Sequence, residues 1–314
     1  MSKTLLVGAT GFLGGAIATE LEIEDTLFLV RGKDIIEASA KLHKNLLKFN
    51  DTRQVPDENI IVSDLANFDI DIIQAQSITK VINAGGNTSF SNNDIIWKTN
   101  VDDTLKFAKV IKEKCLQLEE YVHLGTAFEY SDKTLYTKSK REQVRLLKEL
   151  DLPLTVLRPA IIVGHTTLGC QPSSSIFWIL EAAAATNAFD LLEGKIVDVT
   201  AVDEVASIIA KDEYISFEDQ YITSGANANT IDSILATYKS FKDVEPLSKD
   251  LYKDVKLGLA LYGYFINENK NFSKMGKFVQ TKTPVNDYID VMIESLSDLD
   301  IIQMKNFDFG AHNE

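Results

Sequence analysis

The eight residues GATGFLGG (8–15) decide the fold class, because they follow an apolar run that begins at Thr4 and open a predicted helix. Gly8, Gly11 and Gly14 have no side chain, so the backbone can approach a phosphate closely, and amides at a helix N-terminus supply donors. This order predicts the pyrophosphate site of a dinucleotide. The spacing is G-x-x-G-x-x-G rather than G-x-G-x-x-G, and a tight turn that only allows close helix–sheet packing is the alternative.

Six short apolar runs alternate with helical segments along the first half of the chain. They are rich in Val, Ile and Leu without alternation, which is typical of strands buried on both faces. Strands that alternate with helices predict crossover units and a parallel sheet, so the expected fold is α/β, a doubly wound (Rossmann) sheet. The runs occupy residues 4–9, 26–31, 59–64, 80–85, 121–126 and 154–160.

The end of the second predicted strand, LVRGKD (29–34), indicates which dinucleotide binds. A carboxylate there would bind the ribose 2′-hydroxyl of NAD, whereas Arg31 and Lys33 suit a 2′-phosphate. The sequence therefore favours NADPH (NADP⁺), the alternative being that Arg31 only faces solvent.

The pattern changes after about residue 165. A polar loop, a predicted helix over SIFWILEAAAATNAF (175–189) and a short return precede a mainly helical segment. We expect an NADP-binding domain over 1–164, with 195–225 returning to it. Residues 165–194 and 226–314 are expected to form a smaller, mainly helical substrate-binding lobe.

Composition excludes several classes of function. The formal net charge of -14 argues against a nucleic-acid partner, and no apolar run is long enough to cross a membrane. Cys115 and Cys170 are too few for a disulfide framework, and the four histidines form no metal-ligand spacing with them. We therefore expect a cytoplasmic protein without a metal.

A Tyr/Lys pair in TLYTKSKREQ (134–143) is a candidate acid–base site. Tyr136 precedes Lys140 by four residues, which places both on one face of a helix. Tyr238/Lys242 and Tyr252/Lys256 have the same spacing, so spacing alone does not choose among the three pairs.

Order and spacing of several motifs together resemble the extended and atypical short-chain dehydrogenase/reductase superfamily over about the first 210 residues. The resemblance selects Tyr136 and Lys140 as catalytic, since they alone fall between the fifth strand and LTVLRPA (154–160). It gives Thr126 the place of a serine that binds the substrate oxygen. The stretches that carry it are GATGFLGG, SDLANFD, VINAGGNTSF, NVDDTLKFAKVI, HLGTAFEY, YTKSK, LRPAIIVG and IVDVTAVDEVA.

The resemblance also implies a set of cofactor contacts. Asp64 and Leu65 would lie near the adenine, Ala84 and Gly85 beside the cofactor, and 159–162 beside the nicotinamide. Lys140 would bind the nicotinamide ribose and favour the phenolate of Tyr136. The full implied set is Gly8, Thr10, Gly11, Phe12, Leu13, Gly14, Arg31, Lys33, Asp64, Leu65, Ala84, Gly85, Asn100, Tyr136, Lys140, Pro159, Ala160, Ile161 and Ile162.

Within the superfamily the chain looks most like the thioester reductase and fatty acyl-CoA reductase branch. This implies an NADPH-dependent reductase of an acyl thioester, bound to CoA or a carrier protein, giving aldehyde or alcohol. Alternatives are a ketone or aldehyde reductase, a nucleotide-sugar epimerase or dehydratase, and a non-catalytic NADPH-binding regulator.

Two features of this chain bear on the substrate. Tyr136 follows Thr126 by only ten positions, where extended family members commonly insert a substrate-contacting loop. The short link leaves the pocket open on that side or displaces Tyr136. Lys249, Lys253 and Lys256 are either a docking patch for an acidic carrier or a solvated face, and the oligomeric state is open.

Overall fold

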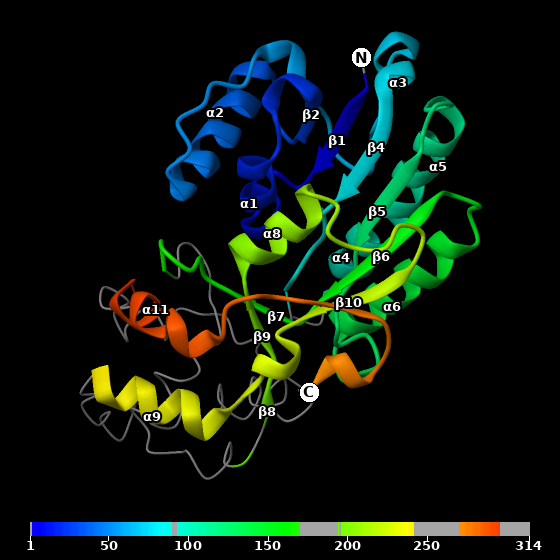
Figure 1. Cartoon of the computed structure of the whole chain (residues 1–314). Coiled ribbons are helices and arrows are strands. Elements are labelled where there is room, and N and C mark those ends of the chain that lie inside the picture. The colour runs from blue at the N-terminus through cyan, green and yellow to red at the C-terminus, as the bar shows by residue number, and fades with distance from the viewer. Residues whose placement is uncertain (1, 90–92, 170–193, 195, 242–269, 296–314) are drawn as a thin grey trace. The chain divides into compact units, whose positions relative to one another are not determined.

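The chain divides into two compact units in the computed structural model, which describes residues 2–89, 93–169, 194, 196–241 and 270–295 (Figure 1). The first unit comprises Met1–Pro159 and Val205–Gln220, and the second comprises Ala160–Glu204 and Tyr221–Glu314. In the part of the chain described, no helix is long and apolar enough to cross a membrane.

Parallel strands form the centre of the first unit, in the order β6-β5-β4-β1-β2-β3. The order steps outward from β1 in both directions, which defines a doubly wound sheet and confirms the predicted fold class. All six predicted strands are present. Their bounds are Lys3–Val7 (β1), Thr26–Val30 (β2), Ile60–Val62 (β3), Ile78–Asn83 (β4), Glu120–Leu124 (β5) and Leu154–Pro159 (β6).

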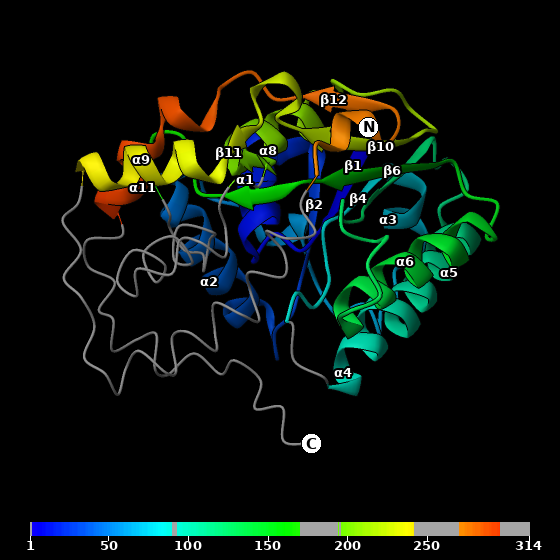
Figure 2. The same ribbon diagram turned by 90° about the horizontal axis from the view of Figure 1, so that it is seen from below.

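Helices cover both faces of this sheet. Figure 1 shows α1 and α2 on one side of the strands and α3, α5 and α6 on the other. In Figure 2 α4 lies at the end of the α5 and α6 layer. The bounds are Phe12–Glu20 (α1), Ile35–Leu46 (α2), Ile72–Ser77 (α3), Asp94–Trp97 (α4), Lys98–Asp103 (a π-helix), Thr104–Lys114 (α5) and Leu135–Lys148 (α6).

Side-chain caps fix where two of these helices begin. The Asp34 carboxylate accepts a hydrogen bond from the Glu37 amide at 2.9 Å, which starts α2. The Thr134 hydroxyl accepts one from the Thr137 amide at 3.1 Å, which starts α6 two residues before Tyr136. An oxygen at the N-cap satisfies a backbone donor that has no partner within the helix.

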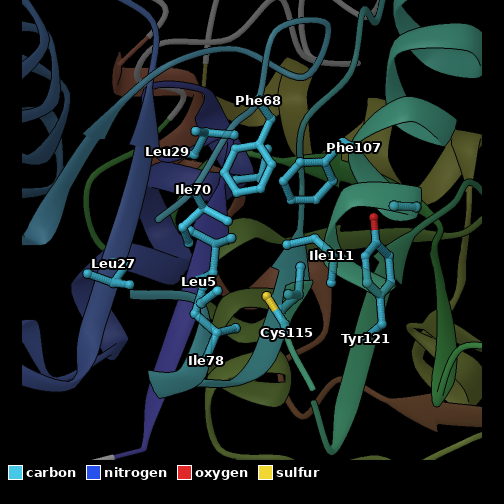
Figure 3. Packing of buried hydrophobic residues seen from close by; sticks show 14 of the residues in the cluster. Leu5, Leu27, Leu29, Phe68, Ile70, Ile78, Phe107, Ile111, Cys115 and Tyr121 are labelled. Atoms are coloured by element: carbon cyan, nitrogen blue, oxygen red, sulfur yellow. The ribbon is translucent and has the colours of Figure 1, made fainter. Parts of the chain in front are cut away.

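An apolar core joins β1, β4 and β5 to α5 (Figure 3). Phe68 and Phe107 meet edge to face with ring centroids 4.7 Å apart, and Leu5, Ile78 and Tyr121 are fully buried beside them. Each such side chain contributes about 1.5–3 kcal/mol on burial. The strand ends that carry the candidate site are thus held by a rigid sheet.

The described residues of the second unit form three short strand pairs and helices. Strands β7 (Ile161–Val163) and β9 (Val199–Ala201) pair in parallel. Strand β8 (Ile196–Val197) pairs antiparallel with β11 (Asn229–Thr230). Residues Tyr221–Thr223 of β10 (Asp219–Thr223) pair in parallel with β12 (Phe278–Gln280). Its helices include α9 (Ile231–Phe241) and α11 (Ile289–Ser295), and α8 (Val202–Ala210) crosses the boundary between the units.

Several predictions fall outside the described residues. These are the helix over 175–189, the pair Tyr252/Lys256, Lys242, and the docking patch Lys249, Lys253 and Lys256. The assignment of residues 165–194 and 226–314 to substrate binding stays a prediction, as do the predicted domain boundaries.

Candidate active site

The glycine turn links β1 to α1 through contacts that leave no room for side chains. The Gly11 amide donates to the Gly8 carbonyl at 2.8 Å, and Gly8 has a φ of 92°. A Cβ on Gly14 would lie 2.1 Å from the Gly8 carbonyl oxygen. Gly11 is the N-cap of α1 and provides no side-chain cap, so the first amides of this helix suit an anion.

Asn45 on α2 holds this turn from behind. Its amide Nδ2 donates to the carbonyls of Ala9 at 2.8 Å and Gly11 at 2.9 Å, and the side chain is buried. Asn45 was not apparent from the sequence, because a single asparagine in a helical segment gives no signal for a contact 36 residues away.

The loop after β2 presents Arg31 and Lys33, both exposed. A carboxylate also lies here, but Glu37 is committed to the loop itself. It accepts a hydrogen bond from the Lys33 amide at 3.0 Å and pairs with Lys41 at 2.6 Å. The bond from Lys41 holds the pKa of Glu37 below its ordinary value. Lys41 also donates to the Arg31 carbonyl at 3.1 Å, so the loop is tied to α2.

The loop after β4 connects the glycine turn to the Tyr/Lys pair. A Cβ on Gly8 would lie 2.8 Å from the Ala84 carbonyl oxygen, and the Ala84 amide donates to the Val7 carbonyl at 3.1 Å. Two residues further, a Cβ on Gly86 would lie 3.6 Å from Lys140 Nζ. Carboxyl ends of parallel strands meet at one edge, which is where open α/β sheets bind ligands.

Asn100 lies in the π-helix, fully buried between this loop and α6. Its Oδ1 accepts from the Asn87 amide at 2.7 Å, and its Nδ2 donates to the Asn87 carbonyl and the Ser139 hydroxyl, both at 3.0 Å. A π-turn within a helix often marks a functional site. The amide of Asn100 is used to position the loop, and its predicted cofactor contact stays a prediction.

Thr126 and Tyr136 come together despite the short link between them. Thr126 lies two residues after the end of β5, and Tyr136 is the second residue of α6. Their side chains are hydrogen-bonded to each other. Burial raises the pKa of Tyr136 to about 12, and the Thr126 hydrogen bond acts in the opposite direction. The ten-residue turn therefore places the two hydroxyl groups side by side.

Charged side chains anchor that turn. The buried guanidinium of Arg158 on β6 is paired with Glu129 and makes two bonds to Asp219, with Nε at 2.5 Å and Nη2 at 2.8 Å. Arg141 on α6 donates to the Glu129 carbonyl at 3.3 Å and to Asp132 at 2.5 Å. The turn is thus held from both the sheet and the helix that carries Tyr136.

Lys140 is buried one helical turn after Tyr136. Its Nζ donates to the Leu124 carbonyl at 2.8 Å and to Gln143 Oε1 at 3.3 Å. Burial lowers the pKa of this ammonium group to about 8. Lysine responds in this direction because a low-dielectric environment disfavours its charged form. The expected effect of Lys140 on the phenolate of Tyr136 stays a prediction.

The other predicted residues are distributed as follows. Phe12 stacks on Phe49 with centroids 6.3 Å apart, Asp64 accepts from the Asn67 amide at 2.8 Å, and Leu65 lies beside Gly85. Thr10 is exposed and Leu13 half-buried. Pro159 ends β6 in the first unit, whereas Ala160, Ile161 and Ile162 belong to the second unit.

A doubly wound sheet with a glycine turn between β1 and α1 is the arrangement of a dinucleotide-binding protein. Residues 4–210 match the NAD dependent epimerase/dehydratase family, and the chain belongs to this family. No curated protein sequence shows significant similarity to the chain.

Solved structures share the fold at low sequence identity. The terminal R domain of the myxalamid PKS-NRPS biosynthetic pathway has a TM-score of 0.71 at 17% identity, covering 94% of this chain and 90% of its own. A thiolation-reductase di-domain from an archaeal non-ribosomal peptide synthetase has a TM-score of 0.67 at 15% identity, with coverages of 95% and 75%. UDP-glucose-4-epimerase from Stenotrophomonas maltophila has a TM-score of 0.62 at 13% identity, with coverages of 98% and 99%.

Proposed function

We propose that this protein is an NADPH-dependent reductase that acts on an acyl thioester. The observation that carries the proposal is the hydrogen bond between Thr126 and Tyr136, one helical turn from the buried ammonium group of Lys140. Each hydroxyl has one proton, so both groups donate to one carbonyl oxygen when that oxygen replaces the bond between them. Such donors stabilise the negative charge that develops on that oxygen when a nucleophile or hydride attacks the carbonyl carbon.

Each residue of the site has a separate task in this reaction. The amides at the start of α1 would bind the pyrophosphate, and Lys140 would orient the nicotinamide ribose. NADPH, when bound, supplies the hydride. Thr126 and Tyr136 hold the carbonyl oxygen, and Tyr136 supplies a proton to it. The resulting thiohemiacetal loses its thiol to give an aldehyde, and a second round would give an alcohol.

Tyr136 needs help to exchange its proton near neutral pH, because burial raises the pKa of its phenol to about 12. The buried cation one helical turn away is Lys140, whose own pKa is about 8, so it carries charge over the lower part of the neutral range. We propose that this charge favours the phenolate once both groups face the ligand.

NADPH is the proposed cofactor because Arg31 and Lys33 are exposed at the end of β2 while Glu37 is occupied by Lys33 and Lys41. A carboxylate that already accepts from a backbone amide and pairs with Lys41 is a poor acceptor for the ribose 2′-hydroxyl of NADH. Two cations at that position favour a 2′-phosphate.

The thioester is preferred over a simple ketone because two of the similar folds are an R domain and a thiolation-reductase di-domain. The similar fold of UDP-glucose-4-epimerase supports an epimerase as the second candidate. An epimerase retains NAD during turnover, whereas a reductase consumes one NADPH for each hydride transferred. Net oxidation of the cofactor therefore separates the two.

The first experiment follows NADPH oxidation with acyl-CoA and carrier-bound thioesters, aldehydes, ketones and UDP-sugars. We expect oxidation with thioesters, and Tyr136→Phe should lower the rate by about 10²–10⁴-fold. Tyr214→Phe is the matched control, since the Tyr214 hydroxyl binds Glu120 and Asp212 near the amino end of β5. Full turnover by Tyr136→Phe would refute the catalytic assignment, and tight NADPH binding without any oxidation would favour a regulator.

The second experiment tests the cofactor. Arg31→Ala should weaken NADPH binding by about 10–100-fold, the usual effect of losing one bond to a charged group, and leave NADH affinity unchanged. Lys109→Ala removes an exposed cation from α5 and serves as the control. Equal losses for the two cofactors in Arg31→Ala would contradict binding of the 2′-phosphate.

A further inference from the structure

A buried polar network lies behind the Tyr/Lys pair and was not apparent from the sequence. Gln143 is fully buried on α6, three residues after Lys140. Its Oε1 accepts from Lys140 Nζ at 3.3 Å, and its Nε2 donates to the Thr104 hydroxyl at 2.9 Å. The Thr104 hydroxyl in turn donates to the Thr99 carbonyl in the π-helix at 3.3 Å. These four residues are called the Lys140 network below.

The chemistry of the groups fixes the direction of every bond in the Lys140 network. An ammonium group only donates, so the amide oxygen of Gln143 must face Lys140. The amide nitrogen then faces Thr104, whose hydroxyl must accept from it and donate to the Thr99 carbonyl. The orientation of the Gln143 amide follows from its neighbours and is the one that satisfies all three bonds.

His123 on β5 supports this orientation. The ring is fully buried, and its nitrogens lie outside good hydrogen-bond geometry with any described residue. Burial holds the pKa of His123 well below its ordinary value, the charge of Lys140 acts in the same direction, and the nearby Gln143 amide opposes them. The neutral ring adds no charge beside Lys140, and because neither of its nitrogens is hydrogen-bonded to a described residue, Gln143 is the described side chain that accepts from the ammonium group.

We infer that Gln143 is a positioning residue for Lys140: its amide ties the ammonium group to the π-helix through Thr104 and fixes where the remaining N–H points. Lys140 has three donors, and two of them are used by the Leu124 carbonyl and Gln143. The third has no partner among the described residues. The Nζ atom lies beside the loop after β4, since a Cβ on Gly86 would be 3.6 Å from it.

The same π-helix also carries Asn100, which binds Asn87 and Ser139. Lys140 and Asn100 are therefore held by one element, and the loop after β4 is placed relative to both. The role of Lys140 in cofactor binding rests on the function proposed above, whereas the contacts of the Lys140 network do not.

The test uses the whole chain and two substitutions of Gln143. Gln143→Met keeps the length of the side chain and removes the acceptor, and Gln143→Glu keeps the shape and adds a charge. Val144→Ala, at a buried neighbour on α6, is the matched control for packing. Each variant is titrated with NADPH by fluorescence. The Lys140 Cε signal is followed against pH by NMR of carbon-13-labelled lysine, with Lys140→Met to assign it.

We expect Gln143→Met to bind NADPH about 10–100-fold more weakly and to titrate Lys140 at a lower pH than the parent protein. Gln143→Glu should titrate Lys140 at a higher pH because its carboxylate stabilises the ammonium form. Besides Lys140, the titratable or charged groups around the network are His123 on β5 and Arg158 on β6. Asp103 precedes Thr104 in the chain and is paired with Lys98, and Tyr136 lies one helical turn before Lys140.

Unchanged Lys140 titration in both Gln143 variants would overturn the inference, and so would equal shifts in Val144→Ala. If Gln143→Met does not fold, Gln143→Glu alone decides. These measurements need no acyl substrate, so a failure of thioester reduction leaves them interpretable. Conversely, turnover with thioesters and an unmoved Lys140 signal would reject the positioning role while keeping the proposed reaction.

Discussion

Replacing Gly14 by alanine tests the close approach on which the glycine turn depends. The added Cβ would lie 2.1 Å from the Gly8 carbonyl oxygen and 2.5 Å from its carbon, whereas Cβ atoms essentially never come within 3.0 Å of another heavy atom. The obstacle is backbone, so α1 or the turn must move by about 0.9 Å. No rotamer change relieves the contact.

The expected loss of stability follows from two opposing effects. Overpacking of this kind costs about 1–3 kcal/mol, and alanine returns about 1 kcal/mol of helix propensity. Because the obstacle is rigid backbone, the overpacking cost should lie at the upper end of its range. The free energy of unfolding of Gly14→Ala should therefore fall by about 2 kcal/mol, which lowers Tm by about 4–8 °C for a unit of this size. NADPH affinity should fall as well, because the amides of the turn move with α1.

Two neighbouring glycines make the experiment discriminating. A Cβ on Gly11 would be 3.2 Å from the Gly8 carbonyl oxygen, so Gly11→Ala should change Tm little but weaken NADPH binding by occupying the approach to the phosphates. A Cβ on Gly15 would meet the side chains of Asn45 and Phe49, which can rotate, and its effect on Tm should be intermediate. Thermal unfolding and NADPH titration of the three variants measure both effects. A Tm for Gly14→Ala equal to that of the parent protein would refute the reasoning.

Two further predictions concern Lys140 and the turn before α6. Burial lowers the pKa of Lys140 from 10.5 to about 8, so the unfolded chain binds more protons than the folded chain between these two pH values. The free energy of unfolding therefore rises with pH across this window. Below pH 8 the buried ammonium group lowers the free energy of unfolding by its full amount, about 3 kcal/mol. Lys140→Met should therefore unfold at a higher temperature than the parent protein at pH 7, with the gap closing toward pH 10.5. Glu129→Gln weakens the contact with Arg158 that holds the turn carrying Thr126, and should lower kcat for NADPH oxidation by about tenfold while NADPH affinity is unchanged.

The controls for these two predictions lie nearby. Lys138→Met changes an exposed lysine on α6 and should show no pH-dependent difference in Tm, and a constant gap for Lys140→Met would contradict the buried ammonium group. Asp132→Asn removes an exposed partner of Arg141, and a loss of kcat as large as that of Glu129→Gln would show that the Arg158 contact is not specific.

Local patterns in the sequence were sufficient to predict the fold. Strands buried on both faces produce continuous apolar runs, and the turn between β1 and α1 requires glycine because other atoms occupy the Cβ positions of Gly8 and Gly14. Both signals are confined to a few residues, so the six strands and the start of α1 were found without knowledge of their neighbours. The pair Tyr136/Lys140 was separated from its two competitors by its position among such local motifs.

The sequence by itself determined the sheet, the glycine turn and the residues that carry the candidate chemistry. Only the tertiary structure decided how those residues are held. Asn45 reaches the glycine turn across 36 residues, Gln143 reaches Thr104 across 39, and Arg158 reaches Glu129 across 29. A polar side chain in a helix or strand looks the same in sequence whether it faces solvent or a buried partner. Its role is set by packing between elements, and periodicity within one element carries no information about that packing.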